Sequence, residues 1–461
     1  MPIIAEIMVP HPPLIIPEVG RGEEKQVLKT IEAYEKAAQF VAELKPDTII
    51  VSSPHSIMYA DYFHVSPKAT AAGSFRRFGA PEVSFRETYD EELVRELCRR
   101  AEALDFPAGI LGERDPSLDH GTMVPLYFIE KYHKDFKLVR VSLSGLSLSD
   151  HYRFGQLIRQ SVDALGRRAV FVGSGDLSHK LQAYGPYGYD ENGPAYDRRI
   201  MEVMGDARFG ELFDFEENFL ERAAECGHRS FLIMAGAVDG MKVIPQKLVH
   251  EDVTGVGYGI CTYLVSGNDE SRHFLEQHEQ KIRQALEEKR KQEDPYVSLA
   301  RKTIELYVGK NEQLKLPDDL PREMLKRRAG TFVSLHEEGR LRGCIGTLFP
   351  TSSCVGQEII NNAIAACSRD PRFDPVTERE LKKLEISVDV LSESEKITSC
   401  DQLDVHRYGI IVSNGRRQGV LLPDLDGVDT VSQQIAICRR KAGIREDEEI
   451  SIERFEVVRH D

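Results

Sequence analysis

The chain of 461 residues lacks three features that would place it directly in a familiar class of protein. Its eight cysteines include no Cys-x-x-Cys pair, which disfavours a zinc knuckle and the disulfide framework of a secreted domain. No run of about 18 apolar residues occurs, so we predict no membrane span. The formal charge of -15 supplies no basic excess for binding nucleic acid or an anionic membrane. We therefore expect a cytoplasmic protein with reduced thiols.

The amino terminus also lacks the pattern of a signal peptide. It has no basic segment ahead of its apolar run, it carries Glu6, and prolines interrupt it at positions 10, 12, 13 and 17. This run instead resembles a buried strand that stops near Val9.

Patterns of strands and helices alternate through the first 267 residues. After the first strand, a helix is predicted over 23–44 and a strand over 48–52, an order that implies a parallel pair joined by a crossover. Further strands are predicted at 136–143, 168–173 and 258–265, and helices at 93–104, 157–165 and 231–238. We therefore predict an α/β domain over residues 1–267.

A second pattern follows a charged segment. Residues 268–294 are rich in Asp, Glu, Lys, Arg and Gln and are predicted to form a solvated helical linker. Beyond it, helices are predicted at 297–308, 355–367 and 431–442, and strands at 331–336, 341–348, 384–391, 409–412 and 419–422. Residues 295–461 are thus predicted to form a separate α+β domain.

Two histidines occupy similar places at the ends of predicted strands. His11 and His55 each stand beside a proline, where an apolar run stops. Functional side chains of α/β proteins lie at the carboxyl ends of strands, and proline stiffens the loop that presents them. The two imidazoles are interpreted as the first half of a metal site, although either could simply form hydrogen bonds in a loop.

Three further segments carry chemically useful side chains. His120 follows Asp119 at a predicted helix start, His179 lies in a glycine-rich strand exit, and Glu225 and Cys226 precede a buried helix. Two imidazoles and one anionic ligand on one face of a divalent ion leave positions for substrate and dioxygen. Because imidazole titrates near neutral pH, we expect His179 to act as general base or acid, and His120 to donate a hydrogen bond to substrate or oxygen.

These motifs resemble those of the class III extradiol ring-cleavage dioxygenase family, the LigB-like fold shared with the Memo proteins. The resemblance covers residues 1 to about 267 and is carried by Pro10-His11-Pro12-Pro13, Ser53-Pro54-His55, the segment 118–126, and Gly175-Asp176-Leu177-Ser178-His179. It implies a central sheet flanked by helices, His11 and His55 as Fe(II) ligands, His179 as acid/base and His120 on the substrate side. The implied activity is that of an oxidoreductase that opens a catechol-type aromatic ring with dioxygen.

The third ligand is where this chain departs from the family pattern. The dioxygenases place a glutamate before the last helix, whereas Memo-like relatives have a cysteine in a Cys-Gly pair, and this chain has Glu225 and Cys226 side by side. A carboxylate favours Fe(II), while a thiolate favours softer metals such as copper or zinc. His228 is a weaker substitute. Both neighbours therefore stay candidates, with Fe(II) as the expected metal.

Residues 295–461 resemble the AMMECR domain. The resemblance is carried by Leu341-Arg342-Gly343-Cys344-Ile345-Gly346, Asp370-Pro371-Arg372-Phe373, Gly419-Val420-Leu421-Leu422-Pro423 and the segment 438–443. Within it, Cys344 beside Arg342 is a candidate activated thiol, because a nearby cation stabilises a thiolate; a buried cysteine packed between glycines is the alternative. The fusion is similar to the pair of domains that accompanies a radical-SAM protein in the AmmeMemoRadiSam set, which implies such a partner.

Other functions stay open on the sequence alone. They are a Memo-like redox or metal-binding module that uses Cys226, a non-catalytic scaffold for a radical-SAM partner, and a zinc hydrolase built on two histidines and a glutamate. The sequence identifies neither the substrate, whose pocket is expected to depend on loops such as 185–193, nor whether the chain forms a homo-oligomer.

Overall fold

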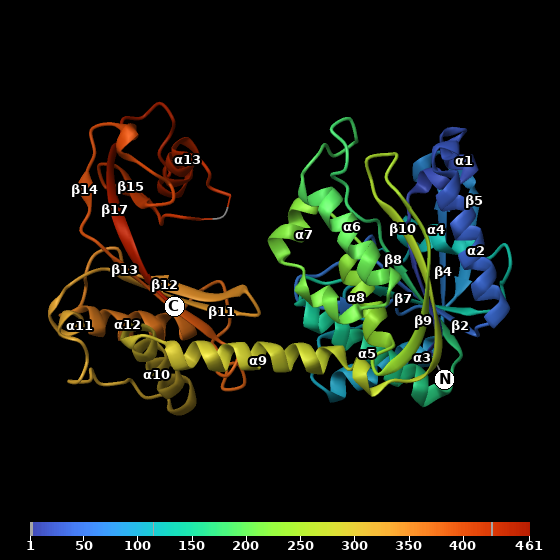
Figure 1. Cartoon of the computed structure of the whole chain (residues 1–461), viewed down its shortest axis with the longest axis horizontal. Helices are drawn as coiled ribbons and strands as arrows, with labels where there is room; N and C mark the ends of the chain where they lie inside the picture. Colours follow the sequence, from blue (N-terminus) through green and yellow to red (C-terminus); the bar gives the residue numbers. More distant parts are fainter. Residues whose placement is uncertain (1–2, 114, 426) are drawn as a thin grey trace. The chain divides into compact units, whose positions relative to one another are not determined.

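The computed structural model describes residues 3–113, 115–425 and 427–461, which form two compact units, Met1–Glu279 and Gln280–Asp461 (Figure 1). The first unit is an α/β fold around a mostly parallel sheet, and the second is built on an antiparallel sheet. The predicted combination of an α/β domain with a separate α+β domain is thereby confirmed.

The strands of the first unit are β1 (Ile3–Val9), β2 (Thr48–Ser53), β3 (Phe63–His64), β4 (Thr70–Phe75), β5 (Ala80–Thr88), β6 (Ala108–Gly109), β7 (Lys137–Ser142), β8 (Ala169–Ser174), β9 (Met241–Glu251) and β10 (Tyr258–Asn268). Its helices are α1 (Pro17–Gly20), α2 (Leu28–Leu44), α3 (Glu91–Ala103), α4 (His120–Ile129), α5 (Leu148–Leu165), α6 (Asn192–Gly205), α7 (Glu217–Ala223) and α8 (His228–Ala237), and α9 (Phe274–Gln292) follows.

The central sheet has the strand order β7-β2-β8-β1-β10-β9. The first four strands are parallel, and β10 and β9 run antiparallel at one side. The strands β1 and β2 are parallel as expected, but they are not neighbours, because β8 lies between them and pairs with both. The carboxyl ends of β2, β8 and β1 therefore stand side by side at one edge of the sheet.

Both faces of the sheet are covered by helices (Figure 1). Alternate residues of one strand enter two different cores: Ile50 packs with α3, α5 and α8, whereas its neighbours Ile49 and Val51 pack with α2 and α4. All residues of β1, β2 and β8 are buried, which explains why these strands appear in the sequence as continuous apolar runs.

A hairpin that the sequence patterns did not predict lies between β3 and α3. It consists of β4 and β5 joined by a short 3-10 turn, Arg76–Phe78. Phe75 and Phe85 anchor it in the core, while Ser84 and Arg86 stay exposed to solvent. The side chains of β5 alternate in this way because a strand has a period of two residues. This hairpin forms one wall of the cavity described below.

The second unit contains a seven-stranded antiparallel sheet with the order β12-β11-β13-β17-β15-β16, in which β14 also pairs with β17. Its strands are β11 (Thr331–Glu337), β12 (Arg340–Gly346), β13 (Glu385–Leu391), β14 (Glu395–Lys396), β15 (Tyr408–Asn414), β16 (Arg417–Leu421) and β17 (Ser451–His460). Its helices are α10 (Pro295–Lys310), α11 (Arg322–Lys326), α12 (Val355–Ser368) and α13 (Val431–Ala442). The unpredicted β17 is rich in charge and joins β13 to β15. Within the described ranges, no helix has the length and apolarity required to cross a bilayer.

Candidate metal centre

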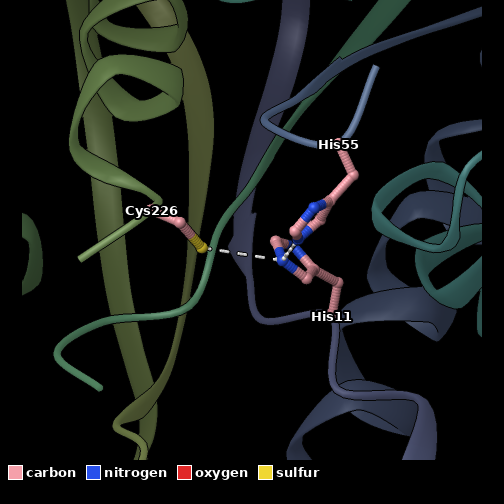
Figure 2. A group of neighbouring side chains, drawn as sticks. All are labelled: His11, His55 and Cys226. Carbon is pink, nitrogen blue, oxygen red and sulfur yellow. Dashed lines mark hydrogen bonds between the residues drawn. The ribbon is translucent and has the colours of Figure 1, made fainter. Parts of the chain in front are cut away.

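Three strand exits of the first unit converge on one place. His11 lies two residues after β1, His55 lies two residues after β2, and Asp176 lies two residues after β8. The register pairs Val9 with Ser174, so the exits of β1 and β8 lie at the same height. Cys226 reaches the same place from the segment that precedes α8. Figure 2 shows the two imidazoles and the thiol directed toward one another.

The spacing of these three side chains suits one metal ion. The Nε2 atoms of His11 and His55 are 2.9 Å apart, and Cys226 Sγ is 3.6 Å from His11 Nε2. One donor atom from each residue lies within 4.8 Å of the other two. Two donors bound 2.0–2.3 Å from the same ion, at ligand angles of 90–110°, would lie about 2.8–3.8 Å apart. The three side chains therefore form a candidate site for a transition metal.

Hydrogen bonds hold the His11 ring in a ligand-ready tautomer. Ser174 Oγ donates its proton to the carbonyl of Gly121 at 2.6 Å, so it accepts a hydrogen bond from His11 Nδ1 at 3.0 Å. The proton on Nδ1 leaves the lone pair on Nε2, the nitrogen that faces His55 and Cys226. The backbone N–H of His11 also donates to Asp176 Oδ1 at 2.8 Å. Partners of this kind orient metal-binding imidazoles.

A second network links His55 to the start of α4. The Ser53 hydroxyl accepts the backbone N–H of His55 at 3.2 Å and donates to Asp119 Oδ1 at 2.5 Å. Asp119 is the N-cap of α4 and accepts the backbone N–H of Thr122 at 3.0 Å. Gly121 is required here, because a Cβ at this position would lie 2.4 Å from Ser53 Oγ. One hydroxyl thus positions both the His55 loop and the first turn of α4.

His120 completes a group of three imidazoles. Its ring centroid lies 3.9 Å from that of His55 and 5.5 Å from that of His11. Burial, together with the neighbouring imidazoles, lowers the pKa of His120 to about 4. Burial also lowers the pKa of His55 and places that of His11 well below its usual value. The three rings are consequently neutral near pH 7, the form that binds metals.

Glu225 and Cys226 point to different neighbours in the structure. Glu225 Oε2 accepts the backbone N–H of His228 at 2.6 Å, at the amino end of α8, and the carboxyl is not among the donors grouped with His11 and His55. Cys226 Sγ instead faces His11 Nε2 and accepts the backbone N–H of Asp176 at 3.3 Å. Burial raises the pKa of Glu225 to about 7 and raises that of Cys226 well above its usual value. Binding of a cation by the thiol is therefore coupled to loss of its proton.

His179 belongs to a second group of donors that also contains Cys226. One donor atom each of Asp176, His179 and Cys226 lies within 4.8 Å of the other two. The carbonyl of Ala224 can only accept a hydrogen bond, so His179 Nδ1 donates to it at 2.6 Å and Nε2 is left free to accept a proton. The Tyr187 ring packs edge-on against the imidazole at 5.0 Å. His228, by contrast, is fully buried and bonded to the Leu212 carbonyl at 2.9 Å.

A cavity of about 1010 Å³ opens beside His55 and His120. Its wall includes residues of the β4–β5 hairpin, such as Phe78, and the first turn of α4. The loop 185–193, which we expected to shape the pocket, does not line this cavity. A space of this size accommodates a small aromatic molecule.

The two residues singled out in the second unit are held within their own network. Arg342 Nε donates to Glu380 Oε1 at 2.6 Å. Cys344 is half-buried; its backbone N–H donates to Asp370 Oδ2 at 2.9 Å, and the hydroxyl of Ser334 donates to Sγ at 3.2 Å. The guanidinium of Arg372 donates to the carbonyl of Cys344 at 3.1 Å, so Arg372 lies beside this cysteine.

The first unit thus has the architecture of an α/β protein with a candidate metal site at the strand ends. A family model described as the catalytic LigB subunit of aromatic ring-opening dioxygenase matches residues 5–261, and the AMMECR1 model matches residues 297–460. The chain belongs to the LigB family and carries an AMMECR1 domain after it. The resemblance drawn from the sequence motifs is thereby confirmed.

Some relatives match the whole chain, and others match one part of it. A protein of Clostridium acetobutylicum is 40% identical over 461 residues, 98% of both chains. A protein of Thermotoga maritima is 48% identical over 170 residues, which are 36% of this chain and 98% of the relative. A crystal structure of a Pyrococcus horikoshii protein is 30% identical, covers 36% of this chain and 88% of its own, and has a TM-score of 0.34.

Several residues of the centre were not predicted as part of it. Ser174 bonds to the His11 ring, and Ser53 with Asp119 positions the His55 loop, but a serine at a strand end carries no distinctive signal in one sequence. Asp176 was noticed in the glycine-rich exit of β8, and its bond to the His11 backbone gives it a structural place in the centre.

Proposed function

We propose that the amino-terminal domain is a non-haem Fe(II) oxygenase that acts with dioxygen on a catechol-type aromatic or a related small molecule. The observation that carries this proposal is the convergence of the His11, His55 and Cys226 donors next to a cavity large enough for an aromatic ring. Family membership supports the same reaction class. When bound, ferrous iron would supply the redox chemistry that couples dioxygen to the diol.

The proposed roles of the protein side chains follow from their hydrogen bonds. His11, with its lone pair on Nε2, and His55 hold the metal together with the Cys226 thiolate. His179 takes the proton of a substrate hydroxyl at Nε2, because Nδ1 is bound to the Ala224 carbonyl. The neutral His120, at the cavity wall, orients the substrate through a hydrogen bond.

The proposal is tested by anaerobic loading with Fe(II) and by metal quantification on an adjacent pair of variants. We expect Cys226→Ser to lose stoichiometric iron and Glu225→Gln to keep it, because only the thiol faces His11. Wild-type protein should then consume oxygen with at least one member of a panel of catechols, and an iron chelator should stop the consumption. Oxygen uptake that survives chelation contradicts the proposal.

A second candidate function is favoured by the thiol itself. Thiolate is softer than the carboxylate of the usual two-histidine, one-carboxylate iron site and suits copper or zinc. In a Memo-like redox or metal-binding module, the protein would bind such a metal through Cys226 and cleave no ring. Stoichiometric copper or zinc without oxygen uptake on any catechol would favour this alternative.

A partner of the radical-SAM class is proposed on the domain pairing alone. If both domains act only as a scaffold for that partner, anaerobically purified protein will hold no stoichiometric metal, and the variants above will leave complex formation unchanged. Metal analysis therefore separates the scaffold from both metal-dependent functions.

A further inference from the structure

The cavity beside the metal centre has an excess of positive charge. The charged side chains that line it are four arginines and two aspartates: Arg76, Arg77, Arg86, Arg140, Asp115 and Asp119. Two of these six, Arg140 and Asp119, form an ion pair with each other and hydrogen bonds with neighbouring residues. Arg140 is 3% exposed, lies 3.5 Å from Asp119, and donates to Ser66 Oγ at 2.8 Å and to the Ser117 carbonyl at 2.6 Å.

The other three arginines belong to the β4–β5 hairpin and are exposed. Arg76 and Arg77 lie on its turn, and Arg86 lies on β5. Within residues 3–113, 115–425 and 427–461, the guanidinium groups of these three arginines form no side-chain hydrogen bond or ion pair. Asp115, the remaining lining carboxylate, accepts the backbone N–H of Ser117 at 2.9 Å. Among the described lining residues, the three hairpin guanidinium groups therefore outnumber the one carboxylate that is not paired with Arg140.

The same cavity has an apolar part that suits a ring. Leu118, Met123 and Phe85 line it, and the ring of Phe78 stands edge-on to His120 at 5.4 Å. Arg77 immediately precedes Phe78, so the aromatic and cationic side chains are presented by one turn of the hairpin.

We infer that this cavity binds an aromatic compound bearing an oxyanion, a carboxylate or a phosphate, which the hairpin arginines Arg76, Arg77 and Arg86 recognise. Guanidinium groups form charge-assisted and often bidentate hydrogen bonds with such oxyanions. This inference rests on the proposed function in so far as the same molecule would present its diol toward His55. It adds the charge of the substrate and the residues that select it.

Binding to metal-free, full-length protein tests the inference without turnover. Calorimetric titration would compare three probes, benzoate, phenyl phosphate and neutral phenol. We expect at least one anionic probe to bind more tightly than phenol, and the better of the two to identify the oxyanion. The double variant Arg76→Gln/Arg77→Gln and the single variant Arg86→Gln should each weaken anion binding by about tenfold or more, the effect of losing a charge-assisted hydrogen bond.

The matched control is Arg95→Gln/Arg99→Gln on α3, which removes the same charge from two exposed arginines away from the cavity. It should leave binding of the anionic probes unchanged. The inference is overturned if phenol binds as tightly as both anions, or if the control variant weakens binding as much as the hairpin variants do.

Oxygen uptake by the iron-loaded protein distinguishes this inference from the proposed function. If no diol is consumed but the hairpin variants still lose anion binding, the proposed function fails and the binding inference stands. If a carboxylated catechol and unsubstituted catechol are consumed equally well by wild-type and hairpin variants, the inference fails and the proposed function stands.

Discussion

The two units differ in the partners of their buried polar side chains. In the second unit, Glu358 is 1% exposed, and its carboxylate accepts hydrogen bonds from Thr347, Thr351 and Ser352. Asp370 likewise accepts from the Arg372 guanidinium and the backbone N–H of Cys344. The hydrogen-bonding capacity of these carboxylates is thus used by neighbouring groups of the same unit.

At the strand ends of the first unit, three side chains that can bind a metal instead contact one another. The Nε2 atoms of His11 and His55 share a hydrogen bond of 2.9 Å between neutral rings, in which His55 donates because the lone pair of His11 lies on Nε2. Cys226 Sγ lies 3.6 Å from the same nitrogen. Grouping these side chains adds little to the stability of a protein without a ligand. In a protein that binds a cation, the same grouping supplies the donor atoms that hold it. The comparison teaches that donors left for a ligand, rather than the number of polar residues, mark the functional unit.

The difference between the two units would disappear if the metal were bound outside the strand ends of the first unit. We expect His11→Ala to lower metal affinity by more than about a hundredfold, beyond the loss caused by removing an outer hydrogen-bond partner. Cys344→Ser, in the second unit, should leave it unchanged. Metal content after anaerobic dialysis measures both, and equal losses would show that the second unit takes part in metal binding.

A subtler change removes the partner that sets the His11 tautomer. Ser174→Ala should weaken metal binding by about tenfold to a hundredfold, because Nδ1 loses its acceptor. Ser161→Ala is a matched control, since this serine is also fully buried but its hydroxyl donates to the Leu157 carbonyl within α5. Competition with a chromophoric chelator gives both affinities, and identical values would refute the role of Ser174.

In the second unit, we expect a substitution of a buried carboxylate to lower stability and to leave metal binding unchanged. Asp370→Asn should reduce its free energy of unfolding by about 1.5 kcal/mol, since a charged acceptor of the Arg372 guanidinium is lost. Metal content should stay constant. Urea denaturation followed by circular dichroism measures the change, with the exposed Asp447→Asn as control. A loss of metal in the Asp370 variant would contradict the separation of roles.

The smallest effect concerns a carboxyl pair away from the metal centre. Burial, with the nearby Glu87 carboxyl, raises the pKa of Glu130 to about 8. The stability associated with the protonated Glu130 is therefore full below its ordinary pKa near 4.5 and is lost as the pH rises toward about 8. Glu130→Gln stays neutral, so it should be more stable than wild type at pH 8 and equal to it near pH 4.

Because Glu130 is only half-buried, solvent screening should limit the gain to about 1 kcal/mol or less. Thermal unfolding of wild type and variant across this pH range measures the difference. The exposed substitution Glu102→Gln on α3 serves as control, and an unchanged difference between pH 4 and pH 8 would contradict the pKa argument.

Much of the core fold was predictable because its signals are local. The apolar runs of β1, β2 and β8 are buried on both faces, and the helices beside them have one apolar stripe. The hairpin of β4 and β5 was not predicted, because segments such as Thr70–Phe75 gain their strand conformation from the partner strand. The charged β17 and the long β9 escaped prediction for the same reason.

The sequence by itself led us to expect that His11 and His55 would lie close together. Each follows a strand of a parallel sheet, and the carboxyl ends of parallel strands share one edge of the sheet. No such reason in the sequence placed His120, which begins α4, against these two rings. Only the tertiary structure distinguished Glu225 from its neighbour, since one residue binds the amino end of α8 and the other faces His11. It also brought the hairpin arginines to the cavity, because contacts between segments distant along the chain leave no periodic trace in either segment.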